Sequence, residues 1–198
     1  MNDTEVRQEI QIIRNMVEKS RRSTAESGGF YVFWGILIIA AMAGTIILES
    51  LRLYRWITLA WTAAVAVGWI YSFVRGFQRA RTRKTETYAE TTARYLGIAC
   101  GTGFLLACFL FPLLKIYPYG TIPMAFSLIA GILFFVLGGI YEWNFLKWIG
   151  LAWWLGSIGL SLLAEIVRNM AFLALFIGCY FIPSLIIWRK YRRAQRNR

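Results

Sequence analysis

The chain has 198 residues, of which 58% are hydrophobic and 16% are charged, whereas a soluble domain is typically about one-quarter charged. The formal net charge is +12, and the chain contains no histidine. The missing imidazole excludes histidine-based acid–base catalysis, haem ligation through histidine and most zinc sites. The basic residues flank long apolar runs, which favours a membrane protein over a nucleic-acid-binding domain.

The segment 1–28 is predicted to begin with a short amphipathic helix. Its apolar residues recur at helical spacing and share one face, which carries Val6, Ile10, Ile13 and Val17. Two interpretations of this stripe stay open: a helix that lies on the cytoplasmic membrane surface, or a helix that binds a protein partner or dimerises. We favour the surface helix, because two heptads are too few to indicate a coiled coil.

Six apolar runs follow, and they predict membrane-spanning helices. Their approximate ranges are 30–48, 56–74, 95–114, 119–140, 148–163 and 170–188. The predicted fold is therefore all-α, an integral membrane bundle of six transmembrane helices that form three hairpins. We predict a cytoplasmic leader over 1–28, a six-span domain over 29–188 with a basic cytoplasmic loop over 75–94, and a basic cytoplasmic tail over 189–198. The hairpins show no convincing sequence repeat.

Small residues at four-residue spacing predict close helix packing on the second and third spans. The second span carries Ala60, Ala64 and Gly68. The third carries Gly97 and Gly101 and, at the same spacing, Ala99 and Gly103. The three cysteines, Cys100, Cys108 and Cys179, all lie within apolar runs, so we interpret them as packing residues.

Positive charge sets the predicted orientation. With the N-terminus inside, eighteen of the 22 Lys and Arg residues fall on inner segments, which places both termini in the cytoplasm. We therefore predict a multi-pass protein of the cytoplasmic membrane. The residues expected to fix this topology or to meet anionic lipids are Arg75, Arg79, Arg81, Arg83 and Lys84 in the loop, and Arg189, Lys190, Arg192 and Arg193 in the tail.

No constellation in the sequence predicts a catalytic, cofactor or metal site. Gly156-Ser157-Ile158-Gly159 resembles a nucleophile turn only superficially, and small residues in a packed helix explain it better. Glu165 with Arg168 and Glu142 with Lys147 are possible ion pairs. As interfacial pairs in turns, they are expected to stabilise hairpin ends, each by less than about 1 kcal/mol.

Both ends of the chain carry short motifs that point to a known group of proteins. Ile13-Arg14-Asn15-Met16-Val17-Glu18-Lys19-Ser20 is followed by a glycine and by Phe33-Trp34-Gly35, and Tyr180-Phe181-Ile182-Pro183-Ser184-Leu185 precedes the basic tail. This arrangement resembles uncharacterised small multi-pass bacterial inner-membrane proteins with an amphipathic N-terminal leader. Ser184 departs from the glycine expected there. The resemblance implies a bacterial cytoplasmic (inner) membrane location and supplies no activity.

The leading functional hypothesis is a non-enzymatic accessory, sensory or scaffold subunit that acts through cytoplasmic-face contacts. The expected partners are membrane lipids, including anionic lipids, and a protein partner or a second copy of the chain. The alternative is a small transporter or channel for a neutral or apolar solute. An enzyme acting on lipid ranks third, and a cleft at the inner leaflet that joined Glu142 to basic residues would favour it. Transport would require polar residues of several spans to line one cavity, drawn from Thr58, Thr62, Cys100, Thr102, Ser127, Ser157, Ser161 and Cys179.

Overall fold

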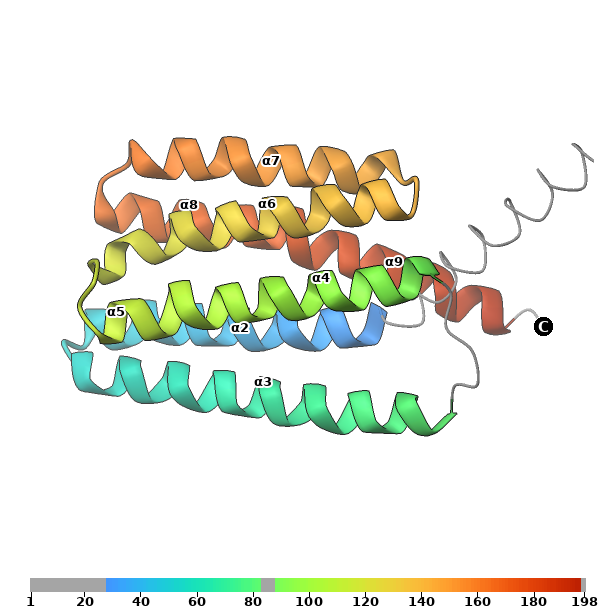
Figure 1. Ribbon diagram of the computed structural model, residues 1–198. Coiled ribbons are helices and arrows are strands. Elements are labelled where there is room, and N and C mark those ends of the chain that lie inside the picture. The colour runs from blue at the N-terminus through green and yellow to red at the C-terminus, as the bar shows by residue number, and fades with distance from the viewer. Residues whose placement is uncertain (1–27, 83–87, 197–198) are drawn as a thin grey trace, which may run out of the picture. The chain divides into compact units, whose positions relative to one another are not determined.

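The structure, a computed structural model, describes residues 28–82 and 88–196, and all the regular elements in that part of the chain are helices (Figure 1). The predicted leader stripe lies outside the described residues. The long helices are α2 (Gly28–Ser50), α3 (Tyr54–Thr82), α4 (Tyr88–Leu105), α6 (Ile122–Ile140), α7 (Asn144–Ser161), α8 (Glu165–Phe176) and α9 (Ile182–Arg196). Shorter segments are the π-helices η1 (Leu106–Leu110) and η3 (Ile177–Phe181), the single turn α5 (Phe111–Leu113) and the 3₁₀ turn η2 (Tyr119–Thr121).

Five helices in the described part of the chain are long and apolar enough to cross a membrane. They cover Gly29–Ser50, Arg55–Gln78, Tyr88–Leu113, Tyr119–Ile140 and Val167–Arg189. The remaining predicted span, 148–163, is the fifth in chain order and corresponds to α7, which has 18 residues but includes Asn144, Lys147 and several glycines and tryptophans. These residues make α7 less apolar than the other five helices.

The helices on both sides of the predicted basic loop continue into it. α3 continues to Thr82, and α4 begins at Tyr88, so much of the predicted loop over 75–94 is helical. The predicted tail is also helical, as α9 continues to Arg196. Arg, Lys, Gln and Ala favour helix, so leaving the apolar region does not end these helices.

The helices form two compact units, which are described separately. The first unit contains α4, η1, α5, α6, α7 and α8 as far as Leu175. The second unit contains α2, α3, η3 and α9, and its C-terminal part begins at Phe176. The continuous helical run from α8 to α9 therefore passes from one unit to the other directly before η3.

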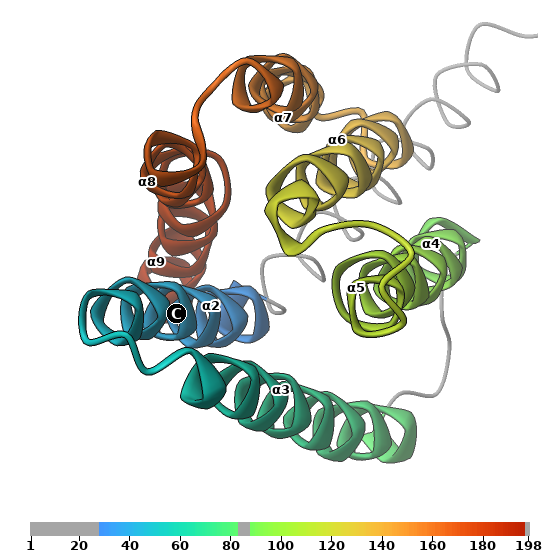
Figure 2. The ribbon, with the colours of Figure 1, turned by 90° about the vertical axis from the view of Figure 1, so that its left-hand side faces the viewer.

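In the first unit, α6 and α7 form a tightly packed antiparallel hairpin, seen from the end in Figure 2. Glycines allow the two backbones to approach. A Cβ atom on Gly150 of α7 would lie 2.7 Å from the Phe135 backbone nitrogen and 2.9 Å from the Gly131 carbonyl oxygen. A Cβ on Gly138 of α6 would lie 2.7 Å from the Lys147 backbone nitrogen. No side chain larger than hydrogen fits at these positions without displacing backbone.

Aromatic rings fill the core of the first unit. Phe126 of α6 lies 4.5 Å from Phe104 of α4, measured between ring centroids, and 5.5 Å from Phe172 of α8. Trp153 of α7 is fully buried beside the Phe126 ring at 5.8 Å. Edge-to-face and tilted ring contacts of this kind add to the stabilisation from buried area.

In the second unit, α2 packs on both α3 and the C-terminal helix. The Trp34 ring covers Gly68, where a Cβ would lie 2.4 Å from the ring, and the Trp34 indole N–H donates to the Ser72 hydroxyl at 3.1 Å. Gly35 of α2 packs against Phe181 of η3, and a Cβ atom on Gly35 would lie 2.8 Å from the Phe181 ring. Gly68 thus belongs to a packing face, as predicted.

The predicted face on the third span is not used in the same way. A Cβ on Gly97 or on Gly101 would meet nothing within 4 Å in the structure. Gly103, two residues further on, lies against Ile129 of α6, with 3.6 Å between a Cβ there and Ile129 Cδ1. Spacing indicated two small-residue pairs on this helix, and of their glycines only Gly103 lies against a residue of another helix in the described part of the chain.

Three turns reverse the chain with the same backbone geometry. Each contains one non-glycine residue in the left-handed region: Arg52 at φ 57°, Lys115 at φ 58° and Glu142 at φ 50°. In each turn, this residue and the next donate backwards to the last carbonyls of the preceding helix, which is a Schellman ending. Glycine usually occupies this position, so these endings could not be predicted from the residue types present.

Candidate functional site

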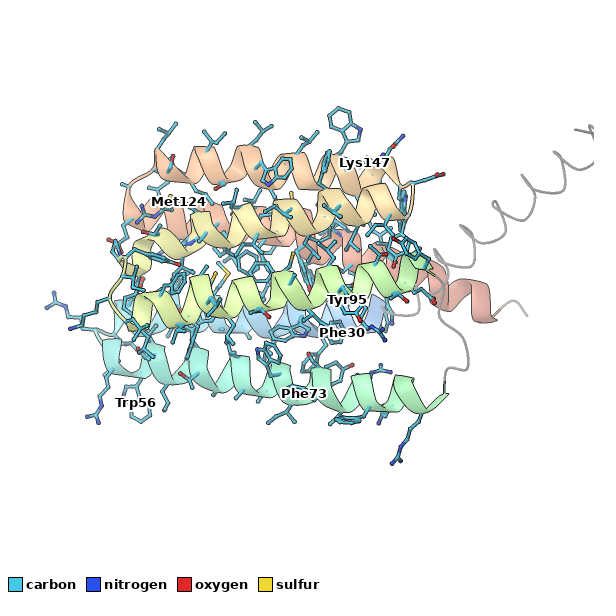
Figure 3. The ribbon with its side chains drawn as sticks, viewed as in Figure 1. Phe30, Trp56, Phe73, Tyr95, Met124 and Lys147 are labelled. Carbon is cyan, nitrogen blue, oxygen red and sulfur yellow. The ribbon has the colours of Figure 1, made fainter. Side chains whose placement is uncertain are left out.

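The hydroxyl groups within the spans bond to nearby backbone. Thr62, Thr102, Ser127 and Ser161 each donate to a carbonyl of their own helix, at 2.7 to 2.9 Å. The Ser157 hydroxyl of α7 donates to the Met124 carbonyl of α6 at 3.1 Å. Met124, which is labelled in Figure 3, lies near the start of α6. Such bonds satisfy the hydroxyl within the helix or tie two neighbouring helices together.

The predicted polar residues differ in how far they are buried. Thr62 and Thr102 are exposed on the surfaces of α3 and α4, whereas Ser127 is completely buried in α6. Among the described residues, no group of three or more His, Cys, Asp or Glu side chains is placed to hold a metal ion. Cys100, Cys108 and Cys179 are all free thiols.

Two π-helical segments interrupt otherwise regular helices, and in each case a proline follows one residue after the segment ends. In η1, the Phe111 N–H donates to the Leu106 carbonyl, five residues back. The next donor in this register would be Pro112, which has no N–H, so the Ala107 carbonyl loses its helical donor. In η3, the Ile182 N–H likewise donates to the Ile177 carbonyl, and Pro183 follows.

A side chain from the following turn supplies the missing donor in η1. The Tyr117 hydroxyl donates to the Ala107 carbonyl, and its ring lies edge-on to Phe111 with centroids 6.2 Å apart. Burial, with a smaller effect of nearby Cys108, raises the pKa of the Tyr117 phenol above its ordinary 10.0. Tyr117 therefore stays protonated and able to donate throughout the physiological range.

The two side chains of the first predicted pair, Glu165 and Arg168, both approach Gly120 of η2. An Arg168 Nη2 atom would lie 2.6 Å, and a Glu165 Oε1 atom 3.7 Å, from a Cβ at that position. The Arg168 Nε atom is buried and has no hydrogen-bond partner in the structure. Gly120 is thus needed to make room for the guanidinium group.

The second predicted pair is Glu142 with Lys147. Glu142 is the left-handed residue of the turn between α6 and α7. Lys147 lies in the first turns of α7 (Figure 3), where its Cγ atom would be 2.7 Å from a Cβ on Gly138. The Lys147 stem thus packs along α6.

The predicted basic surface residues are distributed between two helix ends. Arg75 and Arg81 are exposed on the last turns of α3, and Arg75 donates from Nε to the Tyr71 hydroxyl at 3.1 Å. Arg79 also belongs to α3, and Arg189, Lys190, Arg192 and Arg193 belong to α9. The other predicted contact residues lie outside the described residues: Val6, Ile10, Ile13, Val17, Arg83 and Lys84.

Sequence reasoning missed the paired π-helices and the Tyr117 bond to Ala107. A signal for the former was present, because both segments contain a cysteine four residues before a proline, Cys108 before Pro112 and Cys179 before Pro183. No comparable signal linked Tyr117 to a carbonyl ten residues earlier. Comparison of the chain with protein-family models, with curated proteins and with solved structures gave no match.

Proposed function

We propose that this chain is a non-enzymatic multi-pass membrane protein that acts through contacts at its cytoplasmic face, as an accessory, sensory or scaffold subunit. The observation that carries the proposal is the local use of polar groups within the spans. In five of the predicted polar residues, the hydroxyl donates a hydrogen bond to a nearby backbone carbonyl: Thr62, Thr102, Ser127, Ser157 and Ser161. A solute pathway would instead direct such groups toward a common space.

The proposed topology has six spans with both termini in the cytoplasm of a bacterium. α7 is less apolar than the other five helices, but its 18 residues rise about 27 Å at 1.5 Å per residue, close to the thickness of a bilayer core. It also packs antiparallel against α6, which is itself a candidate span. If α6 crosses the membrane, α7 crosses back, and the large inner excess of Lys and Arg follows the positive-inside rule.

The surface of α3 suits contact with lipid and with anionic head groups. Its large apolar side chains are exposed, with 64% of Ile70 and 60% of Phe73 accessible. Figure 3 shows Trp56 and Phe73 pointing away from α2. Beyond this apolar stretch the same helix carries exposed Arg75 and Arg81. A helix that changes from apolar to basic at one end fits a span that emerges at a negatively charged leaflet.

The contact hypothesis is tested in the native membrane with the doubly substituted variant Ile10→Asp/Ile13→Asp. Two carboxylates on the predicted apolar stripe would disrupt it, so a cross-linked partner recovered with the wild-type chain is expected to be lost. The matched control is Gln8→Asp/Gln11→Asp, which adds the same charge at originally polar positions and should retain the partner. All three chains should reach the membrane fraction equally.

A partner retained by the Ile10→Asp/Ile13→Asp variant would contradict the role given to the leader. A chain recovered alone in every case would favour the second candidate, a small transporter or channel for a neutral or apolar solute. That candidate is supported by one observation, the two proline-interrupted helices, because interrupted spans at corresponding positions are typical of transporters.

A further inference from the structure

The second unit gathers the basic ends of two helices around the start of a third. Phe30, in the first turn of α2 (Figure 3), stacks on Tyr71 near the end of α3, with ring centroids 6.0 Å apart. Trp188 of α9 packs on the preceding residue, Gly29, where a Cβ would lie 3.4 Å from the indole nitrogen. The residues that follow Tyr71 in α3 and Trp188 in α9 therefore leave the unit at the same end, beside the start of α2.

This end of the second unit is strongly positive. Its exposed arginines are Arg75, Arg81 and Arg189. The only acidic residue within 28–82 and 176–196 is Glu49, which lies at the opposite end of α2. A positive surface at the end of a membrane-spanning helix attracts the anionic head groups of the adjacent leaflet.

A hydrogen bond distinguishes Arg75 from Arg81 on the same helix. The Arg75 Nε donates to the Tyr71 hydroxyl at 3.1 Å, and its guanidinium carbon lies 5.8 Å from the centre of the Tyr71 ring. Side chains four residues apart are neighbours on a helix surface, which allows this pairing. Arg81 has Phe77 at the corresponding position, which supplies no hydroxyl.

The Tyr71 ring is itself held by aromatic contacts with α2. It is half-buried, and its centroid lies 4.0 Å from that of Phe33. The hydroxyl accepts the bond from Arg75 and keeps its own hydrogen as a donor. The guanidinium has five N–H donors, of which this bond uses one. Tyr71 and Arg75 thus form a preorganised pair that combines a phenol O–H with a cationic group.

Exposed apolar residues flank this pair on the same face of α3. Val67 lies four residues before Tyr71, and Val74 lies three residues after it, so both are neighbours of Tyr71 on the helix surface. Both valines are exposed. An acyl chain would bury these side chains, whereas a free phosphate ion would gain nothing from them.

We propose that Tyr71 and Arg75 bind the phosphate of an anionic phospholipid whose acyl chain lies along Val67 and Val74. The phenol O–H and the guanidinium both donate to phosphate oxygens, and charge-assisted bonds of this kind are about twice as strong as neutral ones. This inference rests on the proposed topology, which puts the basic end of α3 at the cytoplasmic leaflet. Arg75 is then part of a defined lipid site rather than one charge in a diffuse basic surface.

Native mass spectrometry of the purified full chain in detergent tests the site, with phosphatidylglycerol as the probe. The wild-type chain is expected to retain one phosphatidylglycerol more tightly than phosphatidylethanolamine, whose ammonium group offsets the phosphate charge. Tyr71→Phe keeps the ring and the net charge but loses one hydrogen bond, so it should weaken this binding about fivefold. Arg75→Gln removes the charged donor and should weaken it about tenfold or more.

Two substitutions serve as matched controls. Arg81→Gln removes the same charge from the same helix, and Tyr88→Phe removes a hydroxyl from a residue that is 89% exposed in the first unit. Both control chains should bind phosphatidylglycerol more tightly than the Tyr71→Phe and Arg75→Gln chains do.

Equal affinity of the wild-type and Tyr71→Phe chains for phosphatidylglycerol, or equal weakening by Arg75→Gln and Arg81→Gln, would overturn the proposal. Equally tight binding of glycerol 3-phosphate, which has the phosphate without acyl chains, would overturn the assignment to a lipid. Lipid binding by the purified chain needs no protein partner, so the lipid site and the proposed contact function can fail separately.

Discussion

At the scale of single residues, Tyr117 shows how a turn side chain completes a helix that its own sequence interrupts. Pro112 deprives the Ala107 carbonyl of its helical donor, and a buried carbonyl without a donor is costly. The hydroxyl that replaces this donor comes from beyond the end of the same helix. A proline near the end of an apolar run is normally interpreted as a helix terminus, so this repair could not be predicted from the sequence.

Removing the Tyr117 hydroxyl should therefore lower stability. Tyr117→Phe keeps the ring contact with Phe111 and loses one hydrogen bond, so the free energy of unfolding in detergent should fall by about 1 kcal/mol. Tyr119→Phe is the matched control, because Tyr119 is 57% exposed. Equal stability of the two variants would show that the bond to Ala107 does not stabilise the chain.

The same bond has an expected pH dependence. Burial raises the pKa of Tyr117 in the folded chain above its ordinary 10.0, so its contribution is complete below pH 10.0 and is lost as pH rises through the folded-state pKa. The stability difference between wild type and Tyr117→Phe should accordingly shrink under strongly alkaline conditions, because a phenolate cannot donate.

At the scale of elements, the α6–α7 hairpin is held by glycines that bring two backbones together. The sequence placed both helices, but their close approach depends on which glycines face the partner helix. Gly150 faces backbone atoms of α6, whereas Gly159 on the same helix would have nothing within 4 Å of a Cβ. Spacing patterns do not separate these two cases, since both positions read as small residues in an apolar helix.

The two glycines of α7 should respond oppositely to alanine. Gly150→Ala would force a methyl group to within 2.7 Å of the Phe135 backbone nitrogen and should destabilise the hairpin by about 1–3 kcal/mol. Gly159→Ala should be neutral or stabilising by up to about 1 kcal/mol, because alanine favours helix and the site is open. Thermal unfolding of both variants in the same detergent measures the contrast. A similar loss in both would mean that the hairpin is not held by backbone approach at Gly150.

At the scale of the whole molecule, hydropathy was sufficient to predict an all-helical chain with several membrane-spanning helices. It was less informative about helix ends, because the basic stretches after residue 74 and after residue 188 consist of good helix formers and remain helical. It was also insufficient for α7, whose polar and aromatic content lowers its mean hydropathy below that of the other spans.

The central claim is that six helices cross the membrane and leave both ends in the cytoplasm. It depends on whether α7 crosses the membrane, because the other five helices are already long and apolar enough to do so. The most direct measurement is labelling of single-cysteine variants in intact cells with a membrane-impermeant maleimide. Leu162→Cys, after α7, should be labelled in intact cells, whereas Glu142→Cys, before α7, should be labelled only after permeabilisation. Labelling of both positions from the same side would contradict the account, because α7 would then not cross the membrane.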